Sequence, residues 1–527
     1  MTMLITRRTM RNFSAVMIVA GLLSMGTLAS AATDKKTTTP APAPAPAPAR
    51  PAPAAAPAPR PAGNPGGAVN RPTNVPSTSQ PYRPTPSASQ PYNGGPSANH
   101  PTTTSPTVNG GRNTTYGTSV GTRTPIRAST VVAPRNSREM KAPNGNALRL
   151  RSDGRPSDVH DAQRGMDIHH GLNGGQRVSV ERPDHSRTVF QKGRPGYVQH
   201  PFSFRSHEFA QRTYFYHGRA YNHLYYGYDY RGRYLNVYAP GMYYGAGFYG
   251  WASYPWGSPI AYGWGFGGSP WYGYYGYYFA PYSSYPSASY WLTDYMISSD
   301  LQTDYAAHQE AGEVDGAPPA FAGPPELTPE VKQQIADEVR NQLALENQEA
   351  GLNAHQIEVD PGSSGIDRIL NDAANGKQHV FVVGSALDVV DSSQMECALS
   401  DGDVLGLSTA PLADAKAVDL VVLSSKGGQE CPKQAFVSVT YEDLQEMQNH
   451  MRETIDQGLQ ELQAKQGKGG IPAVPSSASA QPASALYATI APVPDPNAAA
   501  EIQQQAQQAN QSEMEVTAQA TQPNGSQ

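Results

Sequence analysis

Hydrophobic and polar residues alternate in short runs from residue 141 to residue 240, and turn residues separate these runs. Runs such as ALRLR, RVSVE and RTVFQ have the period of two that is typical of a strand with one buried face. The dipeptides Asp153-Gly154 and Asn173-Gly174 favour the positive φ angles that tight hairpin turns require. The pattern therefore predicts a meander of β-hairpins over residues 141–240.

Apolar residues recur at helical spacing in three later stretches, which predicts three amphipathic helices. The first covers 289–308, the second covers 329–346 and begins at the good N-cap Thr328, and the third covers 441–466. Between the second and third helices, β-rich runs separated by Gly-containing turns predict a small barrel or sandwich of four to six strands over 378–440.

Low-complexity composition dominates both ends of the chain. Residues 40–61 are close to an Ala-Pro repeat, which adopts polyproline II and acts as a stiff spacer. The stretches that follow this repeat and that end the chain have too few large apolar side chains to offset chain entropy. With 50 Gly and 48 Pro in 527 residues, we expect a mainly β protein with a few amphipathic helices and long disordered regions.

The amino-acid composition and the spacing of hydrophobic residues change together along the chain, and these changes predict eight regions. The regions are a signal peptide at 1–31, a disordered Ala/Pro-rich and then Pro/Ser/Thr/Asn-rich spacer at 32–140, a β-hairpin region at 141–240, an aromatic Tyr/Trp/Gly-rich segment with a terminal helix at 241–310, a linker with a helix at 311–377, a small β-domain at 378–440, an amphipathic helix at 441–466, and a disordered tail at 467–527.

The first residues have the features of a secretory signal peptide. Arg7, Arg8 and Arg11 precede an apolar run over 13–28, and the small residues at 29–31 form a cleavage site. The run is shorter than the ~20 apolar residues that a membrane-spanning helix needs, so we expect no transmembrane segment in the mature chain. Sec export and twin-arginine export both fit this sequence. The expected location is the periplasm or the cell surface.

The chain has two cysteines, Cys397 and Cys431, and both lie in the predicted small β-domain. Two cysteines in an exported chain most simply form a disulfide. A redox-active pair usually has Cys-x-x-Cys spacing, which these two do not have. The predicted fold is therefore a β-hairpin meander plus a small disulfide-stapled β-domain that is followed by a helix.

Known catalytic motifs are missing from the sequence, and we assign no catalytic, cofactor-binding or metal-binding residue. The net charge of -5 provides no basic field for nucleic acid, so we expect no nucleic-acid partner. Two alternatives stay open. The chain could be an envelope hydrolase acting on glycan or peptide, or a periplasmic metal-binding protein that uses the histidines of the hairpin region. The sequence does not determine an oligomeric state.

Aromatic residues are concentrated in one part of the chain. All five tryptophans lie between positions 251 and 291, and 25 of the 30 tyrosines lie between 197 and 305. These rings could form an aromatic core, or they could form a surface that stacks on sugar or protein. If the segment is extended, side chains alternate between two faces and one face is exposed. The candidate aromatic binding surface then consists of Trp271, Tyr272, Tyr274, Tyr275, Tyr277 and Tyr278.

The strings FYGWASYPW, YGWGFGGSPWYGYYGYYFAPY and LTPEVKQQIADEV are long and distinctive. Over residues 140–472 the chain resembles a family of uncharacterised, predicted secreted bacterial proteins with a Tyr/Trp/Gly-rich central segment. The resemblance implies an architecture and no catalytic residue. We expect an exported, non-catalytic structural or interaction protein of the bacterial cell envelope, with an aromatic surface that contacts glycan or protein partners.

Overall fold

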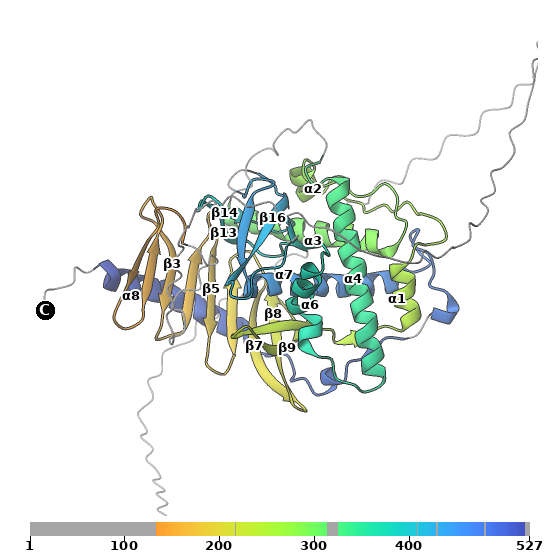
Figure 1. Cartoon of the computed structure of the whole chain (residues 1–527), viewed down its shortest axis with the longest axis horizontal. Helices are drawn as coiled ribbons and strands as arrows, with labels where there is room; N and C mark the ends of the chain where they lie inside the picture. The colour runs from red at the N-terminus through yellow and green to blue at the C-terminus, as the bar shows by residue number, and fades with distance from the viewer. Residues whose placement is uncertain are drawn as a thin grey trace, which may run out of the picture. The chain divides into compact units, whose positions relative to one another are not determined.

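Ten strands form one antiparallel sheet in which each strand pairs with its neighbours in sequence (Figure 1). This arrangement confirms the predicted meander of β-hairpins. The strands are β1 (Arg138–Lys141), β2 (Ala147–Leu150), β3 (Pro156–Asp161), β4 (Met166–His170), β5 (Gln176–Glu181), β6 (Arg187–Gln191), β7 (Gly196–Phe204), β8 (His207–Tyr216), β9 (Arg219–Tyr230) and β10 (Arg233–Ala239).

The structure is a computed structural model, and the part of it that can be described is 133–216, 218–312, 325–407, 409–427, 430–478 and 481–521. All of these residues belong to one compact unit, 113–527. The expected signal peptide at 1–31 and nearly all of the expected spacer at 32–140 lie outside the described residues.

The meander is followed by the short strand β11 (Met242–Tyr243) and then, among the residues described, by six helices, of which α3 and α4 are long. The helices are α1 (Ala246–Ser253), α2 (Pro270–Tyr275), α3 (Ala288–Ala311), α4 (Pro329–Ala354), α5 (Pro361–Ser364) and α6 (Ile366–Ala374). Thr328 caps α4, because its side-chain oxygen accepts a hydrogen bond from Val331 N at 3.4 Å. The helix predicted over 329–346 therefore begins where expected and continues for two further turns.

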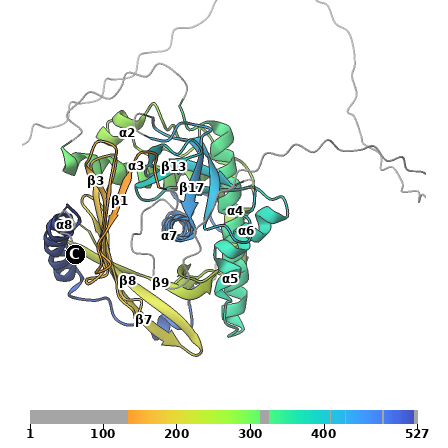
Figure 2. The same cartoon turned by 60° about the vertical axis from the view of Figure 1, so that its left-hand side comes forward.

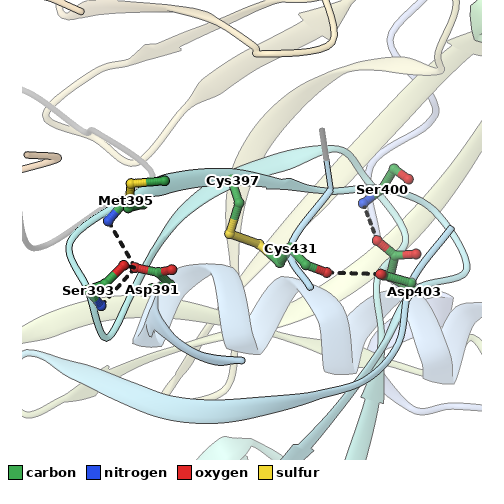
Figure 3. Close-up of a disulfide and its surroundings, with 8 residues drawn as sticks. Asp391, Ser393, Met395, Cys397, Ser400, Asp403 and Cys431 are labelled. Atoms are coloured by element: carbon green, nitrogen blue, oxygen red, sulfur yellow. Dashed lines mark hydrogen bonds between the residues drawn. A yellow bond between two sulfur atoms is a disulfide. The ribbon is translucent and has the colours of Figure 1, made fainter. Parts of the chain in front are cut away.

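A six-stranded antiparallel sheet contains the disulfide, as predicted. Its strands are β12 (His379–Val382), β13 (Leu387–Asp391), β14 (Glu396–Leu399), β15 (Val404–Leu407), β16 (Ala417–Ser424) and β17 (Phe436–Thr440), in the order β12-β15-β16-β17-β13-β14. Cys397 on β14 is bonded to Cys431 with their Cα atoms 4.9 Å apart (Figure 3). The disulfide links β14 to the loop between β16 and β17.

Helix α7 (Tyr441–Lys465) packs against both sheets and against α3, as Figure 2 shows in a view close to the helix axis. Its N-cap is Thr440, whose side-chain oxygen accepts a hydrogen bond from Asp443 N at 3.1 Å. The apolar stripe of α7 meets the aromatic segment, and Met451, Ile455 and Leu459 are buried there. Because α7 contacts β10, β12, β17, α3 and α6, it holds the parts of the fold together.

The end of the chain contradicts the expected disordered tail at 467–527. Its described residues include β18 (Ala483–Ser484), which pairs with β11, and the helix α8 (Ala498–Thr521). Helix α8 lies along the apolar face of the meander, where Ala509 and Val516 are buried with Val159 and Val178 (Figure 1). Small apolar residues seven positions apart are enough to form this contact, because the sheet supplies the larger side chains.

Candidate functional site

The six residues of the candidate aromatic binding surface do not form one exposed patch. Trp271, Tyr275 and Tyr278 are buried in the core, which corrects the expectation that they are exposed. The Tyr275 hydroxyl donates a hydrogen bond to Asp304, and the Tyr278 hydroxyl donates one to the Gly402 carbonyl at 2.7 Å. The expectation is wrong because residues 270–275 form the helix α2, and the alternation argument applies only to an extended chain.

The other three rings of that set, Tyr272, Tyr274 and Tyr277, are half-buried. They pack against the aromatic core, and the Tyr277 hydroxyl donates a hydrogen bond to the Lys426 carbonyl at 3.2 Å. These rings therefore mainly extend the core. A different row of aromatic side chains, with one exposed ring, lies on the meander.

One face of the meander carries a row of polar side chains that crosses five strands. The register pairs these residues directly across β5, β6, β7, β8 and β9, and paired residues project from the same face of a sheet. The row is Glu181, Arg187, Gln199, Arg212 and His223. This polar row lies on one face of the sheet, and α8 covers the apolar side chains of the other face. The two faces of the sheet therefore differ chemically.

A row of tyrosines runs beside this polar row. Tyr197, Tyr214 and Tyr221 are paired across β7, β8 and β9. The ring centroids of Tyr214 and Tyr221 are 5.1 Å apart with the rings nearly parallel, and those of Tyr197 and Tyr214 are 5.2 Å apart. Tyr221 is the outermost ring and is 38% exposed. The row presents stacked rings at the edge of a polar surface.

Arg212 connects the polar row to α7. Its guanidinium donates two hydrogen bonds to the carboxylate of Glu446, at 2.6 and 2.7 Å, and a third to Gln199 Oε1 at 2.9 Å. The guanidinium also lies over the ring of Tyr225, 4.0 Å from the centroid. Burial opposes ionisation of Glu446, but the attraction of Arg212 and Arg187 outweighs it and lowers the pKa of Glu446 to about 2.

A small polar pocket lies between the meander and the N-terminal half of α7. A planar pair forms one of its walls: the imidazole of His185 stacks on the ring of Tyr234 with centroids 3.8 Å apart. Tyr234 crosses β9 at Gly227, where an added Cβ would lie 1.8 Å from the Tyr234 hydroxyl. The pocket is lined by Glu181, His185, Arg187, Gln199, Tyr234, Leu235, Asn236, Glu442, Gln445 and Glu446.

Asn236 lines this pocket, and its side-chain oxygen is buried without a partner among the described residues. Its side chain is 8% exposed, and Oδ1 has no hydrogen-bond partner among the described residues. The backbone around it is fully used, because the Asn449 amide of α7 donates to the Asn236 carbonyl at 2.7 Å and accepts from Tyr238 N at 2.8 Å. A buried polar atom without a partner costs free energy, so Asn236 Oδ1 is suited to accept a hydrogen bond from a bound ligand.

Two of the three carboxylates that line the pocket, Glu442 and Glu446, are held in pairs with arginines. Glu442 accepts two hydrogen bonds from Arg233, at 2.7 and 2.9 Å, as Glu446 does from Arg212. With a pKa of about 2, Glu446 stays ionised near neutral pH and cannot donate a proton as a general acid. The arrangement therefore favours ligand binding over acid–base chemistry.

Six described histidines of the meander, His160, His169, His170, His200, His207 and His223, lie in pairs with carboxylates. His169 lies between Asp158, at 2.8 Å, and Asp388, at 3.1 Å. Burial opposes the charge on His169, but the hydrogen bonds to both aspartates raise its pKa to about 10. A protonated imidazole has no lone pair for a metal. Within the described ranges, no group of three or more His, Cys, Asp or Glu side chains could hold a metal ion.

Sequence reasoning missed this pocket because its residues come from segments that lie far apart. Alternation along a strand predicts which residues share a face of that strand. It does not predict the register between strands, and this register aligns Glu181, Arg187 and Gln199 in one row. The local sequence pattern also does not predict that α7 packs against this row.

In the described part of the chain, no helix is both long enough and apolar enough to cross a membrane. Comparison with protein-family models, with curated proteins and with solved structures finds no match for this chain. The function therefore has to be argued from the geometry of the pocket.

Proposed function

We propose that this protein is an exported, non-catalytic binding protein of the bacterial cell envelope, and that its polar pocket binds a saccharide unit of envelope glycan. The observation that carries the proposal is the buried, unpaired Oδ1 of Asn236 beside the stacked rings of His185 and Tyr234. A sugar hydroxyl can donate to this oxygen while the apolar face of the sugar ring stacks on an aromatic side chain.

The surroundings of the pocket suit an extended ligand. The row of Tyr197, Tyr214 and Tyr221 crosses three strands from a buried ring at Tyr197 to an exposed ring at Tyr221. Arg187, which donates to Ser179 Oγ at 3.2 Å, adds a cationic donor between the pocket and this row. A glycan chain offers repeated ring faces and hydroxyl groups, so it can contact both features at once.

The proposed location depends on the N-terminal sequence and agrees with the disulfide. An apolar run preceded by arginines and followed by small residues is typical of a signal peptide. The disulfide between Cys397 and Cys431 is of the kind that persists in oxidising compartments. The Ala-Pro repeat that follows the expected cleavage site would act as a stiff spacer within the envelope.

The test is co-sedimentation of the purified exported chain with isolated peptidoglycan sacculi, and with insoluble envelope polysaccharide as a second substrate. Asn236→Leu removes the unpaired acceptor while keeping similar volume. We expect it to weaken binding by about tenfold or more, because one buried hydrogen bond contributes about 1–3 kcal/mol. We expect thermal stability to stay equal or to rise, since the variant no longer buries an unsatisfied oxygen.

Tyr254→Ala is the matched control, because Tyr254 is 72% exposed and does not line the pocket. Equal binding by the Asn236→Leu variant and the parent protein would contradict the proposal. Release of new reducing ends from the glycan would instead indicate a hydrolase. Binding to envelope fragments that survives complete digestion of the glycan would indicate a protein partner.

A further inference from the structure

A lysine and an aspartate meet inside the aromatic core, between two long helices. Asp294 lies on α3 and Lys332 lies on α4, and the two residues are 0% and 3% exposed. Lys332 Nζ lies 2.6 Å from Asp294 Oδ1. A buried pair of charges is often no more stabilising than apolar side chains of similar size, so packing alone does not require this pair.

The surroundings of Lys332 are aromatic. Its Nζ lies 3.7 Å from the ring centroid of Tyr282 and 5.1 Å from that of Phe279, and it donates a hydrogen bond to the Ala280 carbonyl at 2.7 Å. Among the described residues, Asp294 is the one carboxylate within ion-pair distance of Nζ. Burial outweighs the attraction of Asp294 and lowers the pKa of Lys332.

The two oxygens of the Asp294 carboxyl group have different environments. Oδ2 accepts hydrogen bonds from Tyr282 N at 2.6 Å and from the Tyr285 hydroxyl at 2.7 Å. Trp264 Nε1 donates to the same Tyr285 hydroxyl at 2.6 Å, which makes this hydroxyl a stronger donor. Oδ1 faces Nζ and accepts no hydrogen bond from the described residues. Burial raises the pKa of Asp294 in spite of Lys332 and the donors on Oδ2.

This arrangement provides what the formation of an amide requires. A neutral amine is a nucleophile and a neutral carboxylic acid can accept it, whereas an ammonium group beside a carboxylate does not react. Both shifts in pKa favour transfer of a proton from Nζ to Oδ1. The two donors on Oδ2 are placed to stabilise the negative charge that develops there when Nζ attacks Cγ. Exclusion of water from the core protects the product from hydrolysis.

We propose that Lys332 and Asp294 form an intramolecular isopeptide bond, which links α3 to α4 covalently. Nζ forms a bond to Cγ of Asp294, and the bond between Cγ and Oδ1 breaks. Oδ1 leaves as water with two protons of the lysine ammonium group, and Oδ2 becomes the carbonyl oxygen of the amide. The reaction consumes no oxidant, reductant or co-reactant. The amide oxygen keeps the hydrogen bonds from Tyr282 N and the Tyr285 hydroxyl.

A second buried lysine–aspartate pair in the chain has the opposite character. Lys426 Nζ lies 2.9 Å from Asp403 Oδ1 and 3.6 Å from Glu430 Oε1. Burial opposes the charge on Lys426, but the attraction of the two carboxylates outweighs it and raises the pKa of Lys426 well above its ordinary value. Lys426 therefore stays an ammonium group, which is not a nucleophile. We expect no amide there, so this pair is an internal control for burial and proximity.

Mass spectrometry of the full chain, purified after export, tests the proposal. The N-terminus is sequenced and the disulfide is reduced, so that the remaining mass difference reports the isopeptide bond. We expect the mass of the parent chain to lie below its sequence mass by one water molecule. Lys332→Arg keeps a cation that does not form the amide, and Asp294→Ala removes the carboxyl group. Both variants should have their full sequence mass.

Trypsin locates the bond, because it cleaves after lysine and arginine but not after an acylated lysine. The sequence has no lysine or arginine between Arg233 and Lys332, and the next arginine is Arg340. The denatured parent chain should therefore yield 234–340 as one peptide. The Lys332→Arg variant should release at least about tenfold more of peptide 333–340, because a well-oriented intramolecular reaction leaves little unreacted lysine in the parent.

Tyr285→Phe tests the donor on Oδ2. It keeps the ring and removes one hydrogen bond to the developing charge, so the bond should form about a hundredfold more slowly after synthesis in a pulse-chase experiment. Tyr295→Phe is the matched control, because Tyr295 packs on Trp291 in the same core. Equal rates in both variants would remove Tyr285 from the reaction.

Two results would overturn the proposal. One is a parent chain that has its full sequence mass and releases peptide 333–340 as completely as the Lys332→Arg variant. The other is a loss of water that persists in the Lys332→Arg variant or maps to Lys426 and Asp403. The parent chain alone gives both readouts, so the test does not depend on the folding of a variant. Neither result bears on glycan binding, because Asp294 and Lys332 do not line the polar pocket.

Discussion

Tyrosines occur both in the meander and in the aromatic segment, yet they are arranged differently in the two regions. In the segment from Tyr244 to Tyr305, rings pack on each other in a core around Trp291, which is 0% exposed and lies 4.8 Å from Trp264 between centroids. In the meander, Tyr197, Tyr214 and Tyr221 stand in a row that becomes more exposed toward β9.

Secondary structure explains the difference. Glycine and proline turns and short helices let the aromatic segment fold back on itself, so most of its rings find other rings on several sides. A strand offers only two faces, and in the meander one of these faces remains polar. Aromatic content therefore does not indicate a surface.

The largest expected effect comes from removing the central ring of the core. Trp291→Ala should lower the free energy of unfolding by about 3–5 kcal/mol, because it leaves a cavity among packed rings. Urea denaturation measures the change. Tyr254→Ala, at an exposed ring of the same segment, should cost less than about 0.5 kcal/mol. Similar losses for both variants would show that the segment has no distinct core.

Acid should weaken the meander contact and spare the aromatic core. The folded-state pKa of Glu446, about 2, lies below its ordinary value of 4.5, so the pair with Arg212 stabilises the fold above pH 4.5 and is lost as pH falls toward 2. In the core, burial outweighs the pair with Lys332 and raises the pKa of Asp294, so protonation there removes no stability.

The Glu446→Gln variant tests this pH dependence. It should cost about 2 kcal/mol at neutral pH, because Arg212 loses charged hydrogen bonds. Its stability should then fall less between pH 4.5 and pH 2 than that of the parent chain. The free energy of unfolding of the parent and of the variant is measured by urea denaturation at each pH. If both fall in parallel with pH, the Glu446–Arg212 pair is not the source of the acid sensitivity.

A smaller effect is expected where Tyr234 crosses β9. In Gly227→Ala the new Cβ would overlap the Tyr234 hydroxyl, so the ring must leave its stack on His185. We expect a loss of about 1 kcal/mol in stability together with weaker glycan binding. Gly241→Ala is the control, because no atom of the described residues lies within 4 Å of a Cβ at that position. If the Gly227→Ala variant binds glycan as well as the parent chain, the stack of His185 on Tyr234 is not needed for ligand recognition.

The smallest effect on stability is expected at the exposed end of the tyrosine row. Tyr221→Ser should change the free energy of unfolding by less than about 0.5 kcal/mol, since the ring is partly in solvent. It should still reduce retention on sacculi, because one stacking face is removed. Unchanged retention would limit the binding surface to the polar pocket.

Local pattern predicted much of this fold. Alternation and the turn dipeptides predicted the meander, capping at Thr328 predicted the start of α4, and the cysteine count predicted the disulfide. The strand order of the small sheet could not be predicted, because β12 and β15 pair across intervening strands. The pocket around Asn236 depends on the same non-local information.

Helix α8 shows the limit of composition as a guide. Its Ala- and Gln-rich sequence is typical of a disordered tail, and only the apolar face of a sheet formed by distant residues gives it a partner. The aromatic segment shows the opposite error, in which a helix is not expected from composition. The sequence of α2 has little helical preference, and this helix lies within the packed core.

The position of α8 has a consequence for the order of events in the cell. Ser512 on α8 donates a hydrogen bond to Asp161 at 2.9 Å, and 351 positions separate these two residues. The strands that α8 covers come earlier in the chain, so their apolar face can be covered only after α8 has also been synthesised.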